Sequence, residues 1–575
     1  MEKKEMTMEV RLLLALVLVG LVIILTPYFY KPPPPQTANK PVAAQTKNPP
    51  AAQNQPAQNS EAQSKAAEAN PKPAAPAKPG LVIPGAVQAD NEETLTVDTD
   101  LYRVVFSNRG ATVKSWILKK YKDAQNKPVD LVNPQSLGKV PAPFSIAFTD
   151  KTASSGLSKA VDEALYKVTR PDPLTLKFEF SDGHVAVEKS FQFKSDSYLV
   201  AVSDQVSQDG AAVPNSLAWR GGFGDATVVN ASKYQQALYY DVSNSKLVTK
   251  PVKDAKDGPV SSAGQYSFAG LEDSYFAAVY LPDGQSQLKL TEFSDAVPDA
   301  AGKPEQRVGA AVGGEGSNSF TLFAGPKDYD LLHKVNPKLE TLIDWGWFKI
   351  LAKPIFLVLN WTAGYLTHNY GWAIIFITVV INMLMFPLKI SSMKSAKKQQ
   401  AIQPLIKAIN EKYKGIPMRD PRQAGKNEEL MGLYKKYGIN PVGGCLPMLI
   451  QLPFLYAFYK VLEISIELRG APFLWVHDLS QPETLPIRML PVILVITQFM
   501  TQKMTPSPGI DPSQQKMMLF MPLVFGYMFY FLSAGLVLYY LTSNLVGVAQ
   551  QWFLNRTTPA PELPPAPVPK KKSRN

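Results

Sequence analysis

The side chains most able to do chemistry in this 575-residue chain are uncharged polar groups inside long apolar stretches. Asn382 lies deep in GWAIIFITVVINMLMFPL, from Gly371 to Leu388, and Gln451 lies in a second apolar stretch. Tyr539 and Tyr540 lie in another. An amide that faces hydrocarbon costs free energy unless it has a hydrogen-bonding partner, so these residues predict a wet, polar or protein-lined interior. Each of them, taken singly, is also typical of a hydrogen bond between packed membrane helices.

Covalent and metal chemistry have little support in the sequence. His184 and His333 do not fall into a recognisable motif of nucleophile, base and orienting acid. The single cysteine, Cys445, excludes an intramolecular disulfide and a metal cluster built on cysteines. We therefore expect a non-enzymatic protein that uses no cofactor.

Six apolar stretches are candidate membrane spans. Residues 1–30 contain the first, which lacks a small-x-small cleavage site and so favours a retained signal-anchor over a cleaved signal peptide. The other five lie within residues 370–554, which we expect to form a membrane core. They are Gly371 to Leu388, Cys445 to Ile466, Leu485 to Met500, Met517 to Leu532 and Leu536 to Phe553.

Basic residues are concentrated in two segments that flank these spans. From Lys389 to Lys436 there are twelve Lys or Arg residues and four Asp or Glu residues, and the tail, residues 555–575, is also basic. The positive-inside rule places both segments in the cytoplasm, and six spans then place both termini there. Such segments can also bind ribosomal RNA or anionic lipid by charge, although they can equally be topology determinants alone.

The basic segment at 389–440 has the pattern of a helical hairpin. Apolar residues recur at helical spacing in two runs, separated by GIPMRDPRQAG, whose Gly and Pro residues interrupt a helix. The runs are Ile402, Leu405, Ile406, Ile409 and Tyr413, then Leu430, Leu433, Tyr434 and Tyr437.

The region before the core divides into three parts. Residues 31–91 are rich in Pro, Ala and Gln and predict a disordered linker. Residues 92–327 alternate apolar and polar side chains, as in PLTLKFEF, VAVEKSFQF and SYLVAVSDQV, and turn signals such as SDG, QDG and PDG separate them. This pattern predicts a large antiparallel β sandwich. In residues 328–369, Trp345, Trp347 and Trp361 lie among apolar and basic residues, which favours an interfacial helix over a span.

Four motifs in the core carry a specific resemblance. They are GGCLPMLIQLP, IELRGAPFLWVHDLS, DPSQQKMMLFMP and SAGLVLYYLTSNLVGVAQQ. From about Trp345 to Phe553 the chain resembles the YidC membrane protein insertases, which are relatives of the mitochondrial oxidase-assembly insertases. The fold class is then a multi-pass α-helical membrane protein of six spans, five of them forming the insertase core, with a periplasmic β-supersandwich similar to sugar mutarotases.

The resemblance also implies a function in the bacterial inner membrane. The core would form a hydrophilic groove, open to the cytoplasm and to lipid, that inserts and helps fold nascent membrane proteins, alone or with the Sec translocon. The substrate would leave along the third and fifth spans. The residues expected on that path are Met448, Leu449, Met521 and Phe525.

One position departs from the family pattern. Family members usually have an arginine five residues before the proline that ends the second span, whereas this chain has Asn382. We hypothesise that Asn382, Gln451 and the Tyr539 region solvate the substrate, while Lys389, two helical turns from Asn382, supplies the positive charge. Two other classes remain as alternatives, namely a transporter and a membrane-anchored periplasmic carbohydrate-binding protein.

Overall fold

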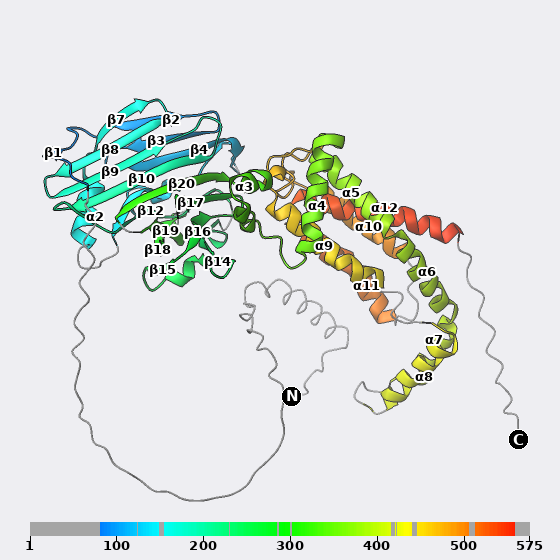
Figure 1. Ribbon diagram of the computed structural model, residues 1–575. Helices are drawn as coiled ribbons and strands as arrows, with labels where there is room; N and C mark the ends of the chain where they lie inside the picture. The colour runs from blue at the N-terminus through cyan, green and yellow to red at the C-terminus, as the bar shows by residue number, and fades with distance from the viewer. Residues whose placement is uncertain are drawn as a thin grey trace, which may run out of the picture. The chain divides into compact units, whose positions relative to one another are not determined.

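The computed structural model describes residues 81–557, except 124, 149–153, 229–230, 285–286, 300–301, 315, 416–419, 421, 440–445 and 505–511. The predicted signal-anchor at 1–30, most of the predicted linker, Cys445 and the tail beyond Thr557 lie outside the described residues. Within the described part, strands come first and helices follow, in the order that the sequence predicts (Figure 1).

The strands of the β domain form three antiparallel sheets among the described residues. The largest has the order β1-β8-β9-β10-β20-β17-β16-β13-β14, with β7 paired to β8 and β11 paired to β10. Its strands are β1 (Ala86–Val87), β7 (Lys167–Asp172), β8 (Thr175–Asp182), β9 (Val185–Gln192), β10 (Leu199–Gln208), β11 (Ala211–Ala212), β13 (Gln236–Asp241), β14 (Lys246–Pro251), β16 (Tyr266–Glu272), β17 (Phe276–Pro282) and β20 (Ser317–Pro326). Strand β1 lies in the stretch that we predicted as a disordered linker. It is ordered because its backbone pairs with the edge strand β8.

The two smaller sheets complete the sandwich. The order β15-β18-β19-β12-β6 comprises β6 (Ser145–Phe148), β12 (Asn215–Trp219), β15 (Val260–Gly264), β18 (Leu288–Pro298) and β19 (Pro304–Gly313). The order β2-β3-β4-β5 comprises β2 (Thr94–Asp98), β3 (Tyr102–Ser107), β4 (Thr112–Lys122) and β5 (Pro128–Asp130). One α-helix, α2 (Ser154–Glu163), is inserted among the described strands.

Alternation and turn chemistry account for the strands. On β8, Leu176, Phe178 and Phe180 are buried in alternation, as the sequence predicts for a strand with one face in the core. The predicted turns at SDG and PDG place Gly183 and Gly284 at φ +93° and +108°, a region that glycine enters without steric cost. The predicted β domain is therefore confirmed in kind and in its strand pattern.

Aromatic side chains join the three sheets into one core. The rings of Phe106 on β3 and Phe191 on β9 lie 4.9 Å apart, and those of Trp116 on β4 and Trp219 on β12 lie 6.2 Å apart. All four side chains are at most 2% exposed. Because large aromatic residues bury the most apolar area, these contacts between sheets are a major source of the domain's stability.

Two charged residues lie opposite each other inside this core. Lys189 on β9 is the register partner of Asp204 on β10, and they are 1% and 3% exposed. The Asp204 carboxylate accepts hydrogen bonds from the side-chain amides of Asn215 and Asn318. Burial nevertheless raises the pKa of Asp204 from 3.8 to about 6, because its charged form loses solvation by water.

The raised pKa of Asp204 makes the stability of the β domain depend on pH. The folded state takes up a proton between pH 6 and pH 4 that the unfolded state does not, so stability falls as pH rises through this window, by up to about 3 kcal/mol. Asp204→Asn should remove this slope. The thermal midpoint of the purified full chain, measured from pH 4 to pH 7, checks it against the exposed Asp241→Asn, which should retain the slope. An unchanged slope in Asp204→Asn would contradict the assignment.

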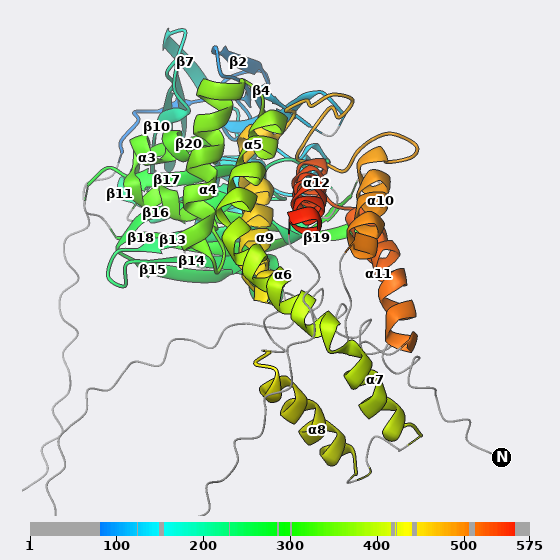
Figure 2. The ribbon, with the colours of Figure 1, turned by 90° about the vertical axis from the view of Figure 1, so that its right-hand side faces the viewer.

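The helices follow the last strand. The connecting segment contains α3 (Tyr329–Val335), η4 (Pro337–Leu342), α4 (Lys349–Trp361) and the π-helical η5 (Thr362–Thr367). The core contains α5 (Tyr370–Leu384), α6 (Phe386–Ala401), α7 (Gln403–Lys412), α8 (Arg422–Lys436), α9 (Leu446–Ile464), η7 (Ile466–Leu468), α10 (Met489–Met504), α11 (Pro512–Phe529) and α12 (Ala534–Thr557). Helix α12 packs against both α5 and α10, and α4 packs against α9 (Figure 2).

The span predicted from Gly371 to Leu388 is two helices. Helix α5 ends at Leu384, and α6 begins at Phe386 with its axis bent by 51°. The cause is Pro387, which has no N–H to donate and whose ring collides with the preceding turn, but which fits the first turn of a new helix.

Membrane-crossing helices are identified by length and composition alone. Among the described residues, Lys349–Thr367 is long and apolar enough to cross a membrane, and the bent pair α5 and α6 qualifies if it is one span. Met489–Met504 and Leu519–Phe529 are shorter apolar helices. The six spans therefore stay a prediction, as does the interfacial placement of α4.

The predicted amphipathic hairpin is formed by α7 and α8, which contact each other. Ile402, Ile406 and Ile439 form a buried cluster. The side chains packed around it are Leu430, Leu433, Tyr434 and Tyr437, as the spacing predicts. Leu405 differs from the prediction, because it is 37% exposed, and Ile409 and Tyr413 also lie outside the cluster.

Candidate functional site

A small cavity between helices of the core brings most of the predicted site residues together. Its volume is about 10 Å³, which is close to the smallest space that holds one water molecule. It is lined by Ile381, Asn382, Met385, Leu388, Lys389, Gln451, Phe454, Tyr539 and Ser543. The side chains come from α5, α6, α9 and α12 and from Met385 at the bend. The cavity is much narrower than the water-filled groove that we expected.

Lys389 reaches back across the bend into this cavity. Its Nζ donates to Asn382 Oδ1 at 2.8 Å and to Gln550 Oε1 at 3.0 Å. The seven-residue spacing therefore places Lys389 and Asn382 on the same side, as predicted, although the helix is broken between them. Hydrogen bonds from an ammonium to neutral amide oxygens hold the cation without cancelling its charge.

The amide groups of the site form one hydrogen-bonded chain. Asn382 Nδ2 donates to the backbone oxygen of Thr378 at 2.8 Å and lies 3.3 Å from Ser543 Oγ. Gln451 Nε2 donates to the same Ser543 oxygen at 3.4 Å. Gln550 Nε2 donates to the backbone oxygen of Asn382 at 3.1 Å. Polar groups from three helices are thus satisfied inside an apolar bundle, as burial requires.

Charge in the site comes from one residue. Among the described residues that line the cavity, Lys389 alone carries a charge. A cation in surroundings of low dielectric constant attracts an anion far more strongly than one in water. The site can therefore hydrogen-bond a polar segment and attract an acidic one.

The two predicted tyrosines lie differently. The ring of Tyr539 lines the cavity and stacks on Phe458, with the centroids 4.2 Å apart. Tyr540 stacks instead on Phe529 of α11, with the centroids 4.8 Å apart, and does not line the cavity. Adjacent residues of a helix point about 100° apart, so both could not face one small cavity.

Ser543 and Gln550 were not predicted as site residues. Both are buried on α12, at 5% and 6% exposure. Their spacing could have predicted them, because Tyr539, Ser543 and Gln550 are separated by four and seven residues and so share one face of a helix. That face is the one turned to the Asn382 side chain.

The residues predicted along the exit path lie on α9 and α11. The side chains of Met448 and Leu449 are outside the described part of α9. Met521 and Phe525 are partly buried, and their neighbours on α11 expose large apolar surface instead. Those neighbours are Leu523, Val524 and Tyr527, which are 51%, 63% and 73% exposed.

Known proteins resemble this chain over most of its described length. A model of the YidC periplasmic domain matches residues 94–358, and a model described as 60Kd inner membrane protein matches residues 361–561. The membrane protein insertase YidC of Cupriavidus necator is 33% identical over 509 residues, which cover 84% of this chain and 86% of the relative. The chain belongs to the YidC family of membrane protein insertases.

Two further YidC relatives also match this chain over most of its length. The YidC of Geotalea daltonii is 33% identical over 567 residues, 96% of this chain and 100% of the relative. The YidC of a Geobacter species is 35% identical over 485 residues, 80% of this chain and 85% of the relative. Membership makes the chain an insertase of the inner membrane with a periplasmic domain, and not an enzyme. It decides against a transporter and against an anchored carbohydrate-binding protein.

Proposed function

We propose that this insertase admits nascent membrane proteins through a groove open to the cytoplasm, whose inner end is the cavity around Asn382 and Lys389. One observation carries this proposal. The Lys389 ammonium is held by the amide oxygens of Asn382 and Gln550 inside an apolar helical bundle. Lys389 is partly buried and pairs with no carboxylate among the described residues, which is costly for a cation, and such groups in membrane proteins usually serve function.

The geometry suggests how the substrate is helped across. A polar segment must cross about 30 Å of hydrocarbon, and each unpaired polar group costs free energy there. Asn382, Gln451 and Ser543 exchange hydrogen bonds among themselves and can exchange them with the segment. Lys389 attracts its acidic residues, and the membrane potential adds about 2.3 kcal/mol per 100 mV for each negative charge moved outward.

Release of the substrate into lipid is driven by burial of its apolar side chains. We place the exit between the third and fifth spans, along Met448 and Leu449 of α9 and Met521 and Phe525 of α11. The exposed apolar residues of α11 offer a surface on which a new span can pack before it enters lipid.

Partners follow from the charge distribution and from the family. The basic hairpin at 389–440 and the tail at 555–575 can attract the ribosome or anionic lipid, and the Sec translocon is the expected partner for larger substrates. Both termini lie in the cytoplasm in this proposal. Contacts of the α9–α10 loop with the periplasmic β domain support this orientation.

Photocrosslinking from the cavity to a stalled nascent chain tests the proposal. A crosslinker at Asn382 or Gln451 should capture the substrate at least tenfold more often than one at Trp475, which lies in the loop between α9 and α10 and is 39% exposed. Capture mainly from Trp475 would contradict a groove that opens to the cytoplasm.

A further inference from the structure

The loop between α9 and α10, residues 465–488, holds one end of the helical core together; we call it the outer loop. At α5, Asn369 Nδ2 donates to the backbone oxygen of Pro472 at 2.9 Å. The Phe473 ring fills the space beside Gly371, where a Cβ atom would overlap it. The outer loop therefore fixes the first turn of α5.

The outer loop also fixes the first turns of α10 and α12. The backbone N–H groups of Ala534 and Gly535, which open α12, donate to the carbonyl oxygens of Gln481 and Leu479 at 2.8 and 2.9 Å. The buried Glu483 carboxylate accepts from the backbone N–H of Leu490 on α10 at 2.9 Å. Three core helices thus begin on one loop.

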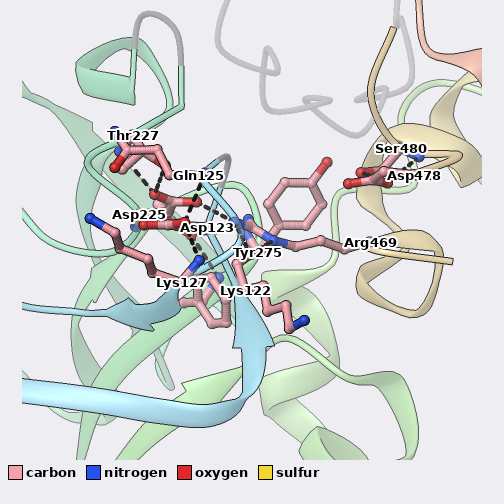
Figure 3. Close-up of polar contacts among 12 residues, drawn as sticks. Lys122, Asp123, Gln125, Lys127, Asp225, Thr227, Tyr275, Arg469, Asp478 and Ser480 are labelled. Carbon is pink, nitrogen blue, oxygen red and sulfur yellow. Dashed lines mark hydrogen bonds and ion pairs between the residues drawn. The ribbon is translucent and has the colours of Figure 1, made fainter. Parts of the chain in front are cut away.

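Arg469 joins the outer loop to the β domain (Figure 3). Its Nε and Nη2 donate to the backbone oxygen of Lys122, at the end of β4, at 3.0 and 2.8 Å. The guanidinium also forms an ion pair with Asp225, and the two side chains are 6% and 2% exposed. It lies over the rings of Tyr275 and Phe276, 5.1 and 5.6 Å from their centroids.

This contact places the outer loop on the periplasmic side, since the β domain is periplasmic. Among the described residues, the other hydrogen bonds to the Asp225 carboxylate come from the backbone N–H and the hydroxyl of Thr227, and neither group carries a positive charge. A buried carboxylate left without its cation is strongly unfavourable, so the contact resists separation. The contact also fixes the orientation of the Arg469 side chain, because the guanidinium donates to a backbone oxygen, pairs with a carboxylate and lies over two aromatic rings.

We propose that Arg469 is a positioning residue for insertion, through which the β domain keeps the outer loop seated and the periplasmic end of the groove closed. This inference rests on the proposed groove. The β domain acts as a brace: it does not touch the substrate, but it prevents the first turns of α5, α10 and α12 from separating when a polar segment enters from the cytoplasm.

A cysteine reporter in the cavity tests the brace in the full-length chain. With Cys445→Ser as background, Ser543→Cys is labelled by a membrane-impermeant maleimide, added to spheroplasts for the periplasmic side and to inverted vesicles for the cytoplasmic side. Arg469→Ala should raise periplasmic labelling at least tenfold. Asp225→Asn should do the same, although it changes only the β domain, and a role confined to local folding of the loop would not produce that effect.

Arg103→Ala is the matched control, because Arg103 forms an exposed ion pair with Asp98 elsewhere in the β domain and should leave labelling unchanged. If Arg469→Ala does not accumulate in the membrane, the periplasmic labelling of the Asp225→Asn variant tests the brace instead. Unchanged periplasmic labelling in Asp225→Asn, or fast periplasmic labelling with Arg469 intact, would overturn the brace. Absence of labelling from the cytoplasmic side would instead count against the proposed groove.

Discussion

Lys389→Ala should slow the insertion of a small membrane protein with an acidic translocated segment about tenfold or more. A hydrogen bond to a charged group contributes about 1.5–3 kcal/mol, and 1.4 kcal/mol corresponds to a factor of ten. Combining it with Asn382→Leu should deepen the loss, because the second polar partner is then absent as well. The measurement is the initial rate of insertion into vesicles that contain the purified variant.

Two controls separate charge from helix stability. Lys394→Ala removes an exposed lysine from the same helix and should leave insertion unchanged. Lys389→Arg keeps the charge and should retain most of the activity. A normal rate for the acidic substrate in the Asn382→Leu, Lys389→Ala double variant would rule out this role for the cavity.

Lys189→Met should destabilise the β domain by about 3–5 kcal/mol, because two buried carbonyl oxygens each lose a hydrogen bond from a charged donor, worth about 1.5–3 kcal/mol. Lys189 Nζ donates to the backbone oxygens of Gly110 and Phe144, both at 2.7 Å, and methionine would leave both without a donor. Burial lowers the pKa of Lys189 to about 8, so the residue is still charged at pH 7, and its loss removes a nearby positive charge from Asp162 and Asp204. Denaturant unfolding of the full-length chain in detergent, followed by tryptophan fluorescence, measures the change.

Lys177→Met on the neighbouring strand β8 is the matched control. Lys177 pairs with Glu179 and Glu188 at the surface, with 36% of its side chain exposed, and such pairs contribute at most about 1 kcal/mol. Equal destabilisation by the two substitutions would show that the buried lysine has no special role.

Local rules accounted for most of the β domain and for part of the site. Alternation at Leu176, Phe178 and Phe180 and the turn glycine Gly183 follow from strand and turn geometry, which depend on neighbours in sequence. Helical spacing likewise placed Lys389 beside Asn382.

The parts that were missed depend on tertiary contacts. Pro387 was taken as the end of the second span, but the helix α6 that begins beside it and the 51° bend were not predicted. Gln550 entered the site only because α12 packs on α5. Arg469 was predicted only to lie in a loop. Its partners Lys122 and Asp225 lie more than 240 positions away in the chain, so the sequence did not indicate these contacts.

A positive charge placed at position 382 should replace the one that Lys389 supplies. If the charge beside Asn382 comes from Lys389, Asn382→Arg should restore insertion of the acidic substrate to the Lys389→Ala variant. We predict an initial rate within about threefold of the unmodified chain, against a loss of about tenfold for Lys389→Ala alone. An exchanged variant that accumulates normally in the membrane but inserts no faster than Lys389→Ala would contradict the account.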